Sequence, residues 1–300
     1  MNIEQLNQNY AIEPHIKFIE HKSGFPLIEI DNTTAKAVIS VYGGQVLSFQ
    51  PKSHSDDLLF VSNKAYYQQG KAIKGGVPIC WPWFGPDPDS KGRPSHGFVR
   101  NRLSKVAQTQ ALSEETTKII LSLSDTPDTR EIWAHPFELS LSLTIGSSLT
   151  LELVTRNLCE QAVSITQGFH TYFKVGDINQ VQVLGLDNTN YFDKVDGGQQ
   201  KLQTGSVTID SEVDRIYTSV GEKLTIEDPS LGRRLCITST GSKSAVVWNP
   251  WEKISLQMGD LEDDDYKRFL CVETVNAATD VINIPSGGEY KLMANYTVES

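Results

Sequence analysis

The chain lacks the features that tie a protein to a membrane or to nucleic acid. It has no run of about eighteen apolar residues, and its N-terminus has no basic segment followed by an apolar one. Lysine and arginine number 27 against 37 aspartates and glutamates, which gives a formal net charge of −10. A chain with this charge does not attract polyanions by its overall field. We therefore expect a cytoplasmic protein with no nucleic-acid partner and no membrane partner, and we take a monomer as the working expectation.

Cysteine is scarce, and the common cofactor motifs are missing. The four cysteines, Cys80, Cys159, Cys236 and Cys271, have no C-x-x-C spacing, which favours reduced structural thiols. The chain contains no G-x-x-x-x-G-K-[ST], G-x-S-x-G or H-E-x-x-H motif. The acidic run at 262–265 lacks the spacing of a calcium-binding loop and is interpreted as a solvated loop. The sequence therefore implies no cofactor and no metal site.

No segment of helical length has an apolar stripe, whereas alternation between apolar and polar residues is frequent. The alternation is strictest at Phe137–Ile145 and resumes after a Gly-Ser-Ser turn, which predicts an antiparallel hairpin over 137–156. Shorter runs predict strands at 26–30, 35–41, 118–124, 180–186, 223–228, 234–239, 245–248 and 289–299. Many short strands separated by turn residues indicate an all-β antiparallel sandwich. We expect one domain over residues 1–300, because large β-sandwiches reach this length.

Residues 75–94 form the longest segment without a regular pattern, and long irregular loops are commonly functional. The aromatic residues in or near it are Trp81, Trp83, Phe84 and Phe98. Either these side chains plug one end of the sandwich, or their flat faces bind the C–H face of a sugar. From Lys91, inside this loop, to Lys105 the chain has basic residues and no acidic one, namely Lys91, Arg93, Arg100, Arg102 and Lys105. Either they bind an anion such as a phosphate, or they point outward from a strand edge.

Two ionisable residues lie in apolar surroundings. Glu273 interrupts the apolar run 269–275, where a carboxylate must be paired, hydrogen-bonded or placed at a strand end. It is either a structural ion-pair partner or a general base, because burial moves a glutamate pKa toward neutral pH. His170 lies between Phe169 and Tyr172. It is either a packed core residue or a proton-transfer group, and this peptide alone favours the core residue.

Motifs that occur in a fixed order along the chain add a resemblance to this interpretation. They are KGGVPICWPWFG, SHGFVR, QGFHTYFKVGD, EVDRIY, VVWNPW and CVETVNA. In this order they resemble the motifs of the hexose-6-phosphate mutarotases, a branch of the aldose 1-epimerase family, from about Gly24 to the C-terminus. The resemblance implies a galactose-mutarotase-like β-supersandwich that works without a cofactor. It also implies interconversion of the α and β anomers of a small sugar phosphate.

The resemblance further implies an acid–base pair. The histidine of the family's H-T-Y-F segment falls on His170, and the glutamate of its C-x-E-T segment falls on Glu273. Opening a hemiacetal ring removes a proton from the anomeric hydroxyl and delivers another to the ring oxygen. We expect Glu273 to take the first proton and protonated His170 to deliver the second, with the roles reversed on closure. A histidine pKa of about 6.5 suits both directions near neutral pH.

The substrate-binding residues that the resemblance implies are Lys74, His96, Arg100 and Asp214. We expect His96 and Asp214 to hold sugar hydroxyls, or His96 to meet the developing charge on the ring oxygen. The phosphate is expected at Lys74 and Arg100. The family usually has an arginine before the Gly-Gly pair, where this chain has Lys74. Lysine keeps the positive charge but loses the bidentate geometry of a guanidinium.

Three other functions stay open from the residues alone. An aldose 1-epimerase that acts on unphosphorylated sugars uses the same acid and base, so only the basic segment separates it from a phosphate-specific enzyme. A non-catalytic carbohydrate-binding sandwich needs the aromatic residues but neither Glu273 nor His170. A role like that of a polysaccharide lyase shares the architecture, but the sequence offers no metal cluster or second domain in its support.

Overall fold

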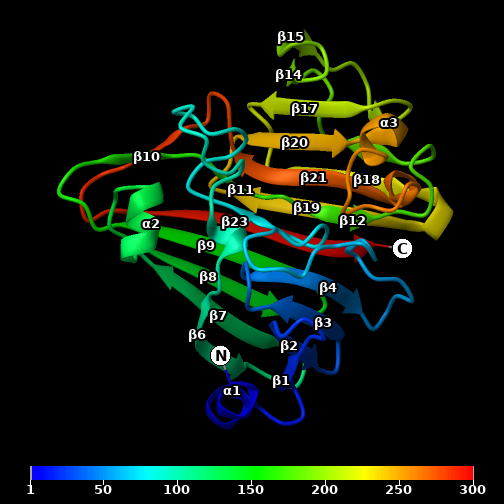
Figure 1. Cartoon of the computed structure of the whole chain (residues 1–300). Coiled ribbons are helices and arrows are strands. Elements are labelled where there is room, and N and C mark those ends of the chain that lie inside the picture. The colour runs from blue at the N-terminus through cyan, green and yellow to red at the C-terminus, as the bar shows by residue number, and fades with distance from the viewer. Residues whose placement is uncertain (1, 300) are drawn as a thin grey trace.

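The computed structural model describes residues 2–299 and consists mainly of antiparallel β-sheets (Figure 1). The terminal residues 1 and 300 of the expected domain lie outside this described range. The larger sheet has nine strands, in the order β16 (Val207–Thr208), β13 (Gln182–Leu184), β18 (Lys223–Asp228), β19 (Arg233–Thr240), β23 (Glu289–Glu299), β9 (Leu149–Asn157), β8 (Phe137–Ile145), β7 (Thr117–Ser124) and β6 (Lys105–Ala111).

A second sheet, of eight strands, carries the candidate site. Its order is β15 (Gln199–Leu202), β14 (Asn190–Asp193), β17 (Val213–Thr218), β20 (Ser244–Asn249), β21 (Phe269–Asn276), β11 (Gln167–Phe169) and β5 (Ile79–Cys80), and β12 (Tyr172–Lys174) also pairs with β21. A four-stranded sheet contains β1 (Ile16–Glu20), β2 (Pro26–Asp31), β3 (Ala35–Ser40) and β4 (Gln45–Pro51), and β10 (Val163–Ile165) pairs with β22 (Ile282–Ile284).

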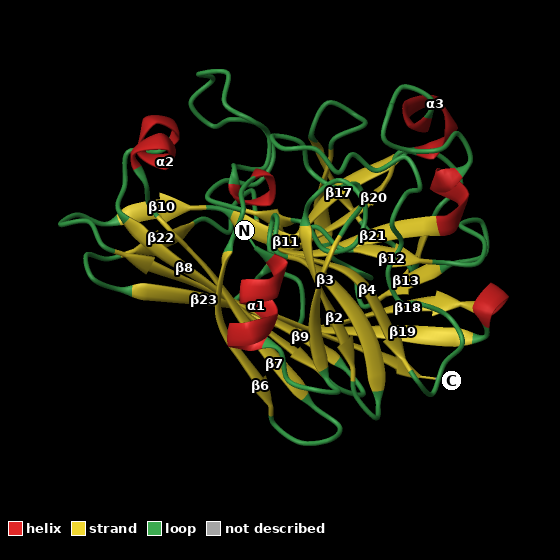
Figure 2. Cartoon of the chain, turned by 60° about the horizontal axis from the view of Figure 1, so that its bottom comes forward, coloured by secondary structure: helices red, strands yellow, loops and turns green. Residues whose placement is uncertain are grey.

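The helices are short and lie at the edges of the strand layers (Figure 2). They are α1 (Ile3–Tyr10), α2 (Pro127–Ile132) and α3 (Trp251–Ser255), with 3₁₀ turns η1 (Val99–Asn101), η2 (Pro229–Leu231) and η3 (Asp265–Arg268). Within residues 2–299, no helix has the length and apolar character needed to cross a membrane.

The main hydrophobic core lies between the two large sheets. Leu141 and Leu151 of the nine-stranded sheet belong to the same buried cluster as Leu270 and Val272 of the eight-stranded sheet. Thr171 adds a polar link, because its hydroxyl lies 2.6 Å from the hydroxyl of a buried tyrosine on β23. The two sheets are therefore fixed against each other, and one face of the eight-stranded sheet points away from this core.

The predicted all-β antiparallel architecture is confirmed. The hairpin expected over 137–156 is β8 and β9, and the strands expected at 223–228 and 289–299 have these bounds in β18 and β23. The strand expected at 180–186 is shorter, because only Gln182–Leu184 pairs with neighbours. Helix α1 had no signal, since its single buried side chain makes no apolar stripe.

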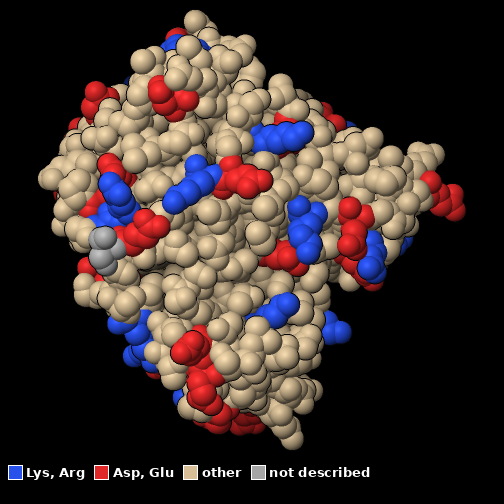
Figure 3. All heavy atoms as spheres, turned by 180° about the vertical axis from the view of Figure 1, so that it is seen from behind, with Lys and Arg blue, Asp and Glu red and all other residues tan. Residues whose placement is uncertain are grey.

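Charged side chains of both signs are interspersed on the face of the molecule shown in Figure 3. Exposed charges are commonly paired, as in Lys201 with Asp196 at 2.7 Å and Arg156 with Glu138 at 3.3 Å. Such exposed pairs contribute little to stability. The face in Figure 3 therefore offers no broad basic surface, in agreement with the net charge of −10.

Gly76 allows the chain to pass close to β4 just after Lys74. Its φ is +62°, and a Cβ placed there would lie 2.2 Å from the carbonyl oxygen of Val46. We expect Gly76→Ala to lower the free energy of unfolding by about 3 kcal/mol or more, measured by urea denaturation. Gly70→Ala is the matched control, because Gly70 has a φ of +80° but no atom within 4 Å of the added Cβ. Equal losses in the two variants would contradict the close approach.

Candidate active site

The candidate site is a cavity of about 400 Å³ over one face of the eight-stranded sheet. Successive side chains of a strand point to opposite faces of the sheet. In β21, Leu270 and Val272 therefore join the core, whereas Glu273 faces the cavity. The register pairs Val246 of β20 with Glu273 on one side and with Ile216 of β17 on the other. These three side chains form one row of the cavity floor.

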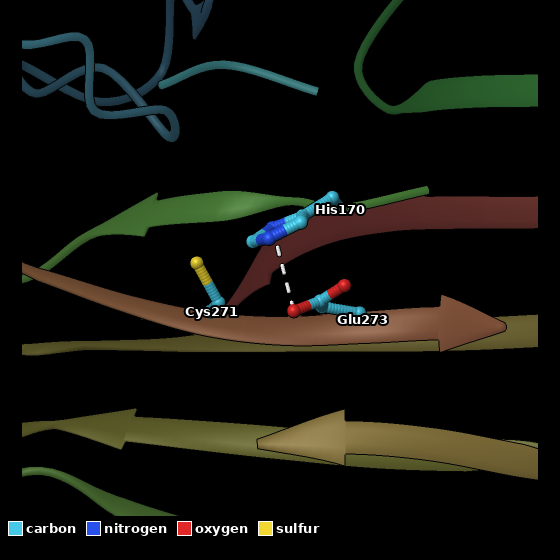
Figure 4. A group of neighbouring side chains, drawn as sticks. All are labelled: His170, Cys271 and Glu273. Atoms are coloured by element: carbon cyan, nitrogen blue, oxygen red, sulfur yellow. Dashed lines mark ion pairs between the residues drawn. The ribbon is translucent and has the colours of Figure 1, made fainter. Parts of the chain in front are cut away.

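His170 lies in a two-residue gap between β11 and β12. Phe169 of β11 pairs with Thr274 of β21, and β12 resumes in the same register, so His170 comes to lie opposite Glu273. The backbone N–H of His170 donates to the carbonyl of Pro78 at 3.0 Å rather than to β21. Its Nδ1 atom is 3.3 Å from Oε1 of Glu273 (Figure 4). His170 and Glu273, about a hundred positions apart in the sequence, thus meet because β21 pairs with both β11 and β12, the strands on either side of the gap.

Aromatic rings fix the orientation of the His170 imidazole. It stacks on Tyr172 with ring centroids 4.9 Å apart and an interplanar angle of 8°, and it meets Trp248 edge to face at 5.7 Å. The His96 ring is 5.4 Å away on the cavity side. The sequence left open whether His170 is packed or chemically active, and the structure shows a packed ring that also contacts the buried carboxyl of Glu273.

Burial determines the protonation of this pair. Burial lowers the pKa of His170 well below its usual value, and the positive charges of Arg100 and Lys74 and the neighbouring His96 lower it further. Burial also raises the pKa of Glu273 well above its usual value, and Asp214 adds to this shift while Arg100 opposes it. In the unliganded site the proton therefore stays on the carboxyl and the imidazole is neutral. The expected pKa of about 6.5 for His170 does not describe the unliganded site.

Two atoms of the pair have no hydrogen-bond partner among the described residues. They are Nδ1 of His170 and Oε2 of Glu273, and both are buried. The 3.3 Å separation of Nδ1 from Oε1 is within ion-pair distance, but the two groups are not aligned as a hydrogen bond. Glu273 is thus not fixed by a structural salt bridge to a lysine or arginine in the part of the chain that the structure describes.

His96 is held at the cavity wall by a strained backbone. Its φ is +62°, its N–H donates to the carbonyl of Gly85 at 2.7 Å, and the N–H of Gly85 donates to its Nδ1 at 3.3 Å. Phe84 packs edge to face on the ring at 4.9 Å. Burial lowers the pKa of His96 to about 3, with Arg100 and Lys74 adding to the effect. A neutral ring whose Nδ1 accepts a hydrogen bond carries its proton on Nε2, so His96 is a hydrogen-bond donor.

Two cations lie on the same side of the cavity as the histidines. Lys74 is half-buried, its Nζ lies 3.5 Å from Oδ2 of Asp260, and burial lowers its pKa while Asp260 opposes this. Arg100 donates through Nη2 to the carbonyl of Ser95 at 2.9 Å, and its buried Nε has no partner among residues 2–299. A third cation, Lys194, lines the cavity together with Asp214. An anion in the cavity would meet the first two cations beside His170.

The basic segment at 91–105 does not act as one anion site. Of its five basic residues only Arg100 lines the cavity. Arg93 donates through Nε to Asp87 at 2.8 Å and lies over the ring of Trp83, and Lys91 pairs with Asp89 at 3.0 Å. Lys91, Arg93 and Trp83 line a separate hollow of about 530 Å³ beside α2. The carboxylates that neutralise Lys91 and Arg93 belong to Asp89 and Asp87, just before this segment in the sequence. A count of charges that starts at position 91 therefore omits them.

The aromatic residues of the loop also divide between the two roles left open. Trp81, Trp83 and Phe98 are buried in the core, so they plug the end of the sandwich. Phe84 lines the cavity, and Trp248 from β20 supplies a second aromatic surface there. A sugar in this cavity would therefore meet Phe84 and Trp248 rather than the two loop tryptophans.

The structure brings all the predicted site residues to one cavity, namely Lys74, His96, Arg100, His170, Asp214 and Glu273. Sequence reasoning missed Asp260 and Lys194. Asp260 adjoins the acidic run that was interpreted as solvated, and nothing in the sequence marks Lys194. The solvated interpretation of that run was wrong for Asp265, which is fully buried and accepts hydrogen bonds from Ser62 and from the N–H of Glu262.

The four cysteines form no disulfide with one another. Cys80, Cys236 and Cys271 are buried and Cys159 is half-buried. Burial raises the pKa of the Cys80 thiol to about 12 and that of Cys271 well above its usual value, so both remain protonated at neutral pH. This agrees with the prediction of reduced thiols.

Comparison with known sequences gives a consistent picture. A sequence profile described as aldose 1-epimerase matches residues 26–297. A protein of Escherichia coli strain K12, provisionally named a glucose-6-phosphate 1-epimerase, is 34% identical over 253 residues, which cover 84% of this chain and 83% of the relative. A protein of Cenchrus ciliaris with the same provisional name is 35% identical over 264 residues, which cover 85% and 79% of the two chains.

Solved structures extend the comparison. A crystal structure from Salmonella typhimurium, provisionally named a mutarotase, superposes with a TM-score of 0.90 at 31% identity and covers 97% of this chain and 96% of that one. A galactose mutarotase-like protein from Clostridium acetobutylicum superposes with a TM-score of 0.75 at 15% identity over 95% and 98% of the two chains. The second likeness concerns the fold alone, and this fold is the galactose-mutarotase-like β-supersandwich.

Asp214 gives a test of how strongly the cavity is desolvated. Burial raises its pKa from 3.8 to about 6, although Lys194 opposes the shift. Because the folded chain then holds this proton more tightly than the unfolded chain, ionisation costs stability as the pH rises from about 4 through about 6. We expect Asp214→Asn to be more stable than the wild type at about pH 8, by up to about 3 kcal/mol, and equally stable below about pH 4.

Urea denaturation at the two pH values measures this difference. Asp210→Asn is the matched control, because Asp210 is exposed on the same stretch of chain and should change stability little at either pH. A stability difference for Asp214→Asn that does not depend on pH would mean that the carboxyl is not desolvated.

Proposed function

Since the chain belongs to the aldose 1-epimerase family and is therefore an isomerase that interconverts sugar anomers, we propose that its substrate is a hexose 6-phosphate, with glucose 6-phosphate as the first choice. The observation that carries this proposal is the buried His170–Glu273 pair, 3.3 Å apart, beside a cavity whose cations gather on the histidine side. The pair supplies the chemistry, and the cations supply the preference for a phosphate.

The positions of the charges fit the shape of the substrate. In a pyranose 6-phosphate, C5 carries both the ring oxygen and C6, so the phosphate lies close to the ring oxygen and far from O1 along the ring edge. Lys74 and Arg100 both lower the pKa of His170, and Arg100 also lowers that of Glu273, so Lys74 is the cation that acts on the histidine side of the pair. Asp214 is the charge that most raises the pKa of Glu273. A phosphate at Lys74 and Arg100 therefore brings the ring oxygen to His170 and the anomeric hydroxyl to Glu273.

The free site already holds the proton that the reaction needs. A neutral imidazole with a protonated carboxyl has the same number of protons as an imidazolium with a carboxylate. Once a side-chain rotation aligns Oε1 of Glu273 with Nδ1 of His170, which are 3.3 Å apart, the transfer of one proton converts the first form into the second. A bound phosphate dianion offsets the charges of Lys74 and Arg100, which raises the pKa of His170 and favours the second form. Substrate binding therefore prepares the acid and the base together.

Ring opening then proceeds as one balanced transfer. The Glu273 carboxylate takes the proton of the anomeric hydroxyl, the C1–O5 bond breaks as C1 becomes an aldehyde carbon, and the His170 imidazolium gives its proton to O5. The aldehyde turns about the C1–C2 bond, and O5 attacks its other face while both proton transfers run in reverse. His96 donates from Nε2 to a sugar oxygen, and Asp214 accepts from a hydroxyl.

The acid–base pair is tested by conservative substitution. We expect Glu273→Gln and His170→Asn each to slow the exchange between the anomers of glucose 6-phosphate by about 10² to 10⁴, the usual contribution of a positioned acid or base. Exchange spectroscopy by NMR measures both directions at equilibrium, and circular dichroism checks that the variants fold. Folded variants that exchange the anomers at the wild-type rate would falsify the pair and favour a non-catalytic carbohydrate-binding sandwich.

The phosphate preference is tested at Lys74. We expect Lys74→Met to raise KM for glucose 6-phosphate about 10- to 100-fold, because one charge-assisted contact to the phosphate is lost. Exchange of unphosphorylated glucose should not slow, because loss of the lysine charge removes one of the groups that lower the pKa of His170. Lys74→Arg should restore binding of the phosphorylated sugar. Lys91→Met is the control, since Lys91 belongs to the basic segment at 91–105 and pairs with Asp89 outside the cavity.

The comparison of substrates in the wild-type enzyme completes this test. Faster exchange of glucose 6-phosphate than of glucose is the expected outcome. Equal acceleration of both sugars, together with no effect of Lys74→Met, would leave an aldose 1-epimerase for free sugars as the function of this chain.

A further inference from the structure

Cys271 lies beside the acid–base pair and takes no part in the proposed reaction. It precedes Glu273 by two positions on β21, so both side chains point to the same face of the sheet, toward His170 (Figure 4). One donor atom from each of these three residues, an imidazole nitrogen, a thiol sulfur and a carboxylate oxygen, lies within 4.8 Å of the other two. The three residues are all buried.

The hydrogen bonding of the cluster is incomplete. Nδ1 of His170 and Oε2 of Glu273 are buried and have no hydrogen-bond partner among the described residues, and the Glu273 side chain is only 2% exposed. Leaving a buried polar atom unpaired costs free energy. A cation placed between the histidine, the thiol and the carboxyl would give each of these groups a partner.

The set of donors fits zinc. Thiolate, imidazole and carboxylate groups bind Zn²⁺ at about 2.0 to 2.3 Å, and a tetrahedral arrangement separates such donors by roughly 3.3 to 3.8 Å. The donors of His170, Cys271 and Glu273 are within 4.8 Å of one another, so small side-chain rotations bring them to this spacing. The fourth position of the ion would be taken by water or by an oxygen atom from the cavity.

The charges of the neighbourhood make such an ion exchangeable. One thiolate and one carboxylate match the two positive charges of the metal. Lys74, Arg100 and Lys194 repel the ion, whereas Asp214 and Asp260 attract it, so the surroundings carry a small net positive charge that weakens binding.

We propose that His170, Cys271 and Glu273 form a site for Zn²⁺, and that its occupation blocks the acid–base pair. The metal-binding part stands on the cluster alone. The blocking part rests on the proposed function, because a metal that holds both the imidazole and the carboxylate leaves neither free to move a proton. Zinc and the sugar phosphate are then mutually exclusive ligands.

Cobalt(II) provides the direct test on the whole chain, since it reports its ligands by colour. We expect the chelator-treated wild-type protein to bind one Co²⁺ with tetrahedral visible bands and a near-ultraviolet band from sulfur-to-metal charge transfer. Cys271→Ser should lose the sulfur band and weaken binding about tenfold or more. Zn²⁺ at a free concentration set by a metal buffer should displace the cobalt and stop anomer exchange in the wild type. In Cys271→Ser, Zn²⁺ should slow the exchange only weakly, and without metal the exchange rate should match that of the wild type.

Controls separate this site from binding elsewhere. Cys159→Ser removes the other thiol near an imidazole, 3.6 Å from Nδ1 of His135, and should change neither binding nor inhibition. If Cys271→Ser does not fold, Cys271→Ala replaces it. A sulfur band that survives loss of Cys271, or no cobalt binding at all, would overturn the site. Binding at Cys271 without loss of exchange would overturn only the inhibition, and an absence of exchange before metal is added would instead contradict the proposed function.

Discussion

The burial of the Glu273 carboxyl against the His170 imidazole, on the cavity face of the eight-stranded sheet, is the constraint on which the rest of the site depends. In water the carboxyl would be ionised and the imidazole partly protonated near neutral pH, whereas here desolvation drives the pKa of Glu273 up and that of His170 down. The pair can then exchange one proton without a net change in charge. Such a pair suits a reaction that needs an acid and a base in either direction. The bound substrate must then shift the shared proton from Glu273 to His170.

The strand pairing supplies this geometry at little cost. β21 is buried on both faces, so it has no solvent-facing side on which a carboxylate could rest. Its odd positions, Cys271 and Glu273 among them, face the cavity layer, and its even positions face the core between the sheets. Because β11 and β12 pair with the same strand in one register, the residues in their gap are held at fixed depth. The sheet sets the position of His170, and the aromatic rings set its angle.

The parts of the fold and of the candidate site that could be predicted are those whose residues leave a pattern in the sequence. Strict alternation predicted β8 and β9, because one face of each contacts the core. The same rule says little about β21, which is buried on both faces and whose polar residues Glu273, Thr274 and Asn276 show no alternation. The order of the motifs predicted the cavity residues. The predicted positive charge of the basic segment was too large, because the carboxylates that pair with Lys91 and Arg93 lie just before it in the sequence. The pKa of His170 was beyond sequence reasoning, because the charges and the burial that lower it come from several distant strands and loops.

The cations near His170 explain why an anionic substrate suits this site better than a neutral one. Burial is the main cause that lowers the pKa of His170, and the charges of Arg100 and Lys74 add to it, so together they disfavour the imidazolium. A phosphate dianion cancels the effect of these charges at the moment when the ring oxygen reaches the histidine. An unphosphorylated sugar brings no such charge, so it must be opened by a histidine whose pKa is still low. In this way the phosphate, which is recognised but does not react, sets the protonation of His170, which does.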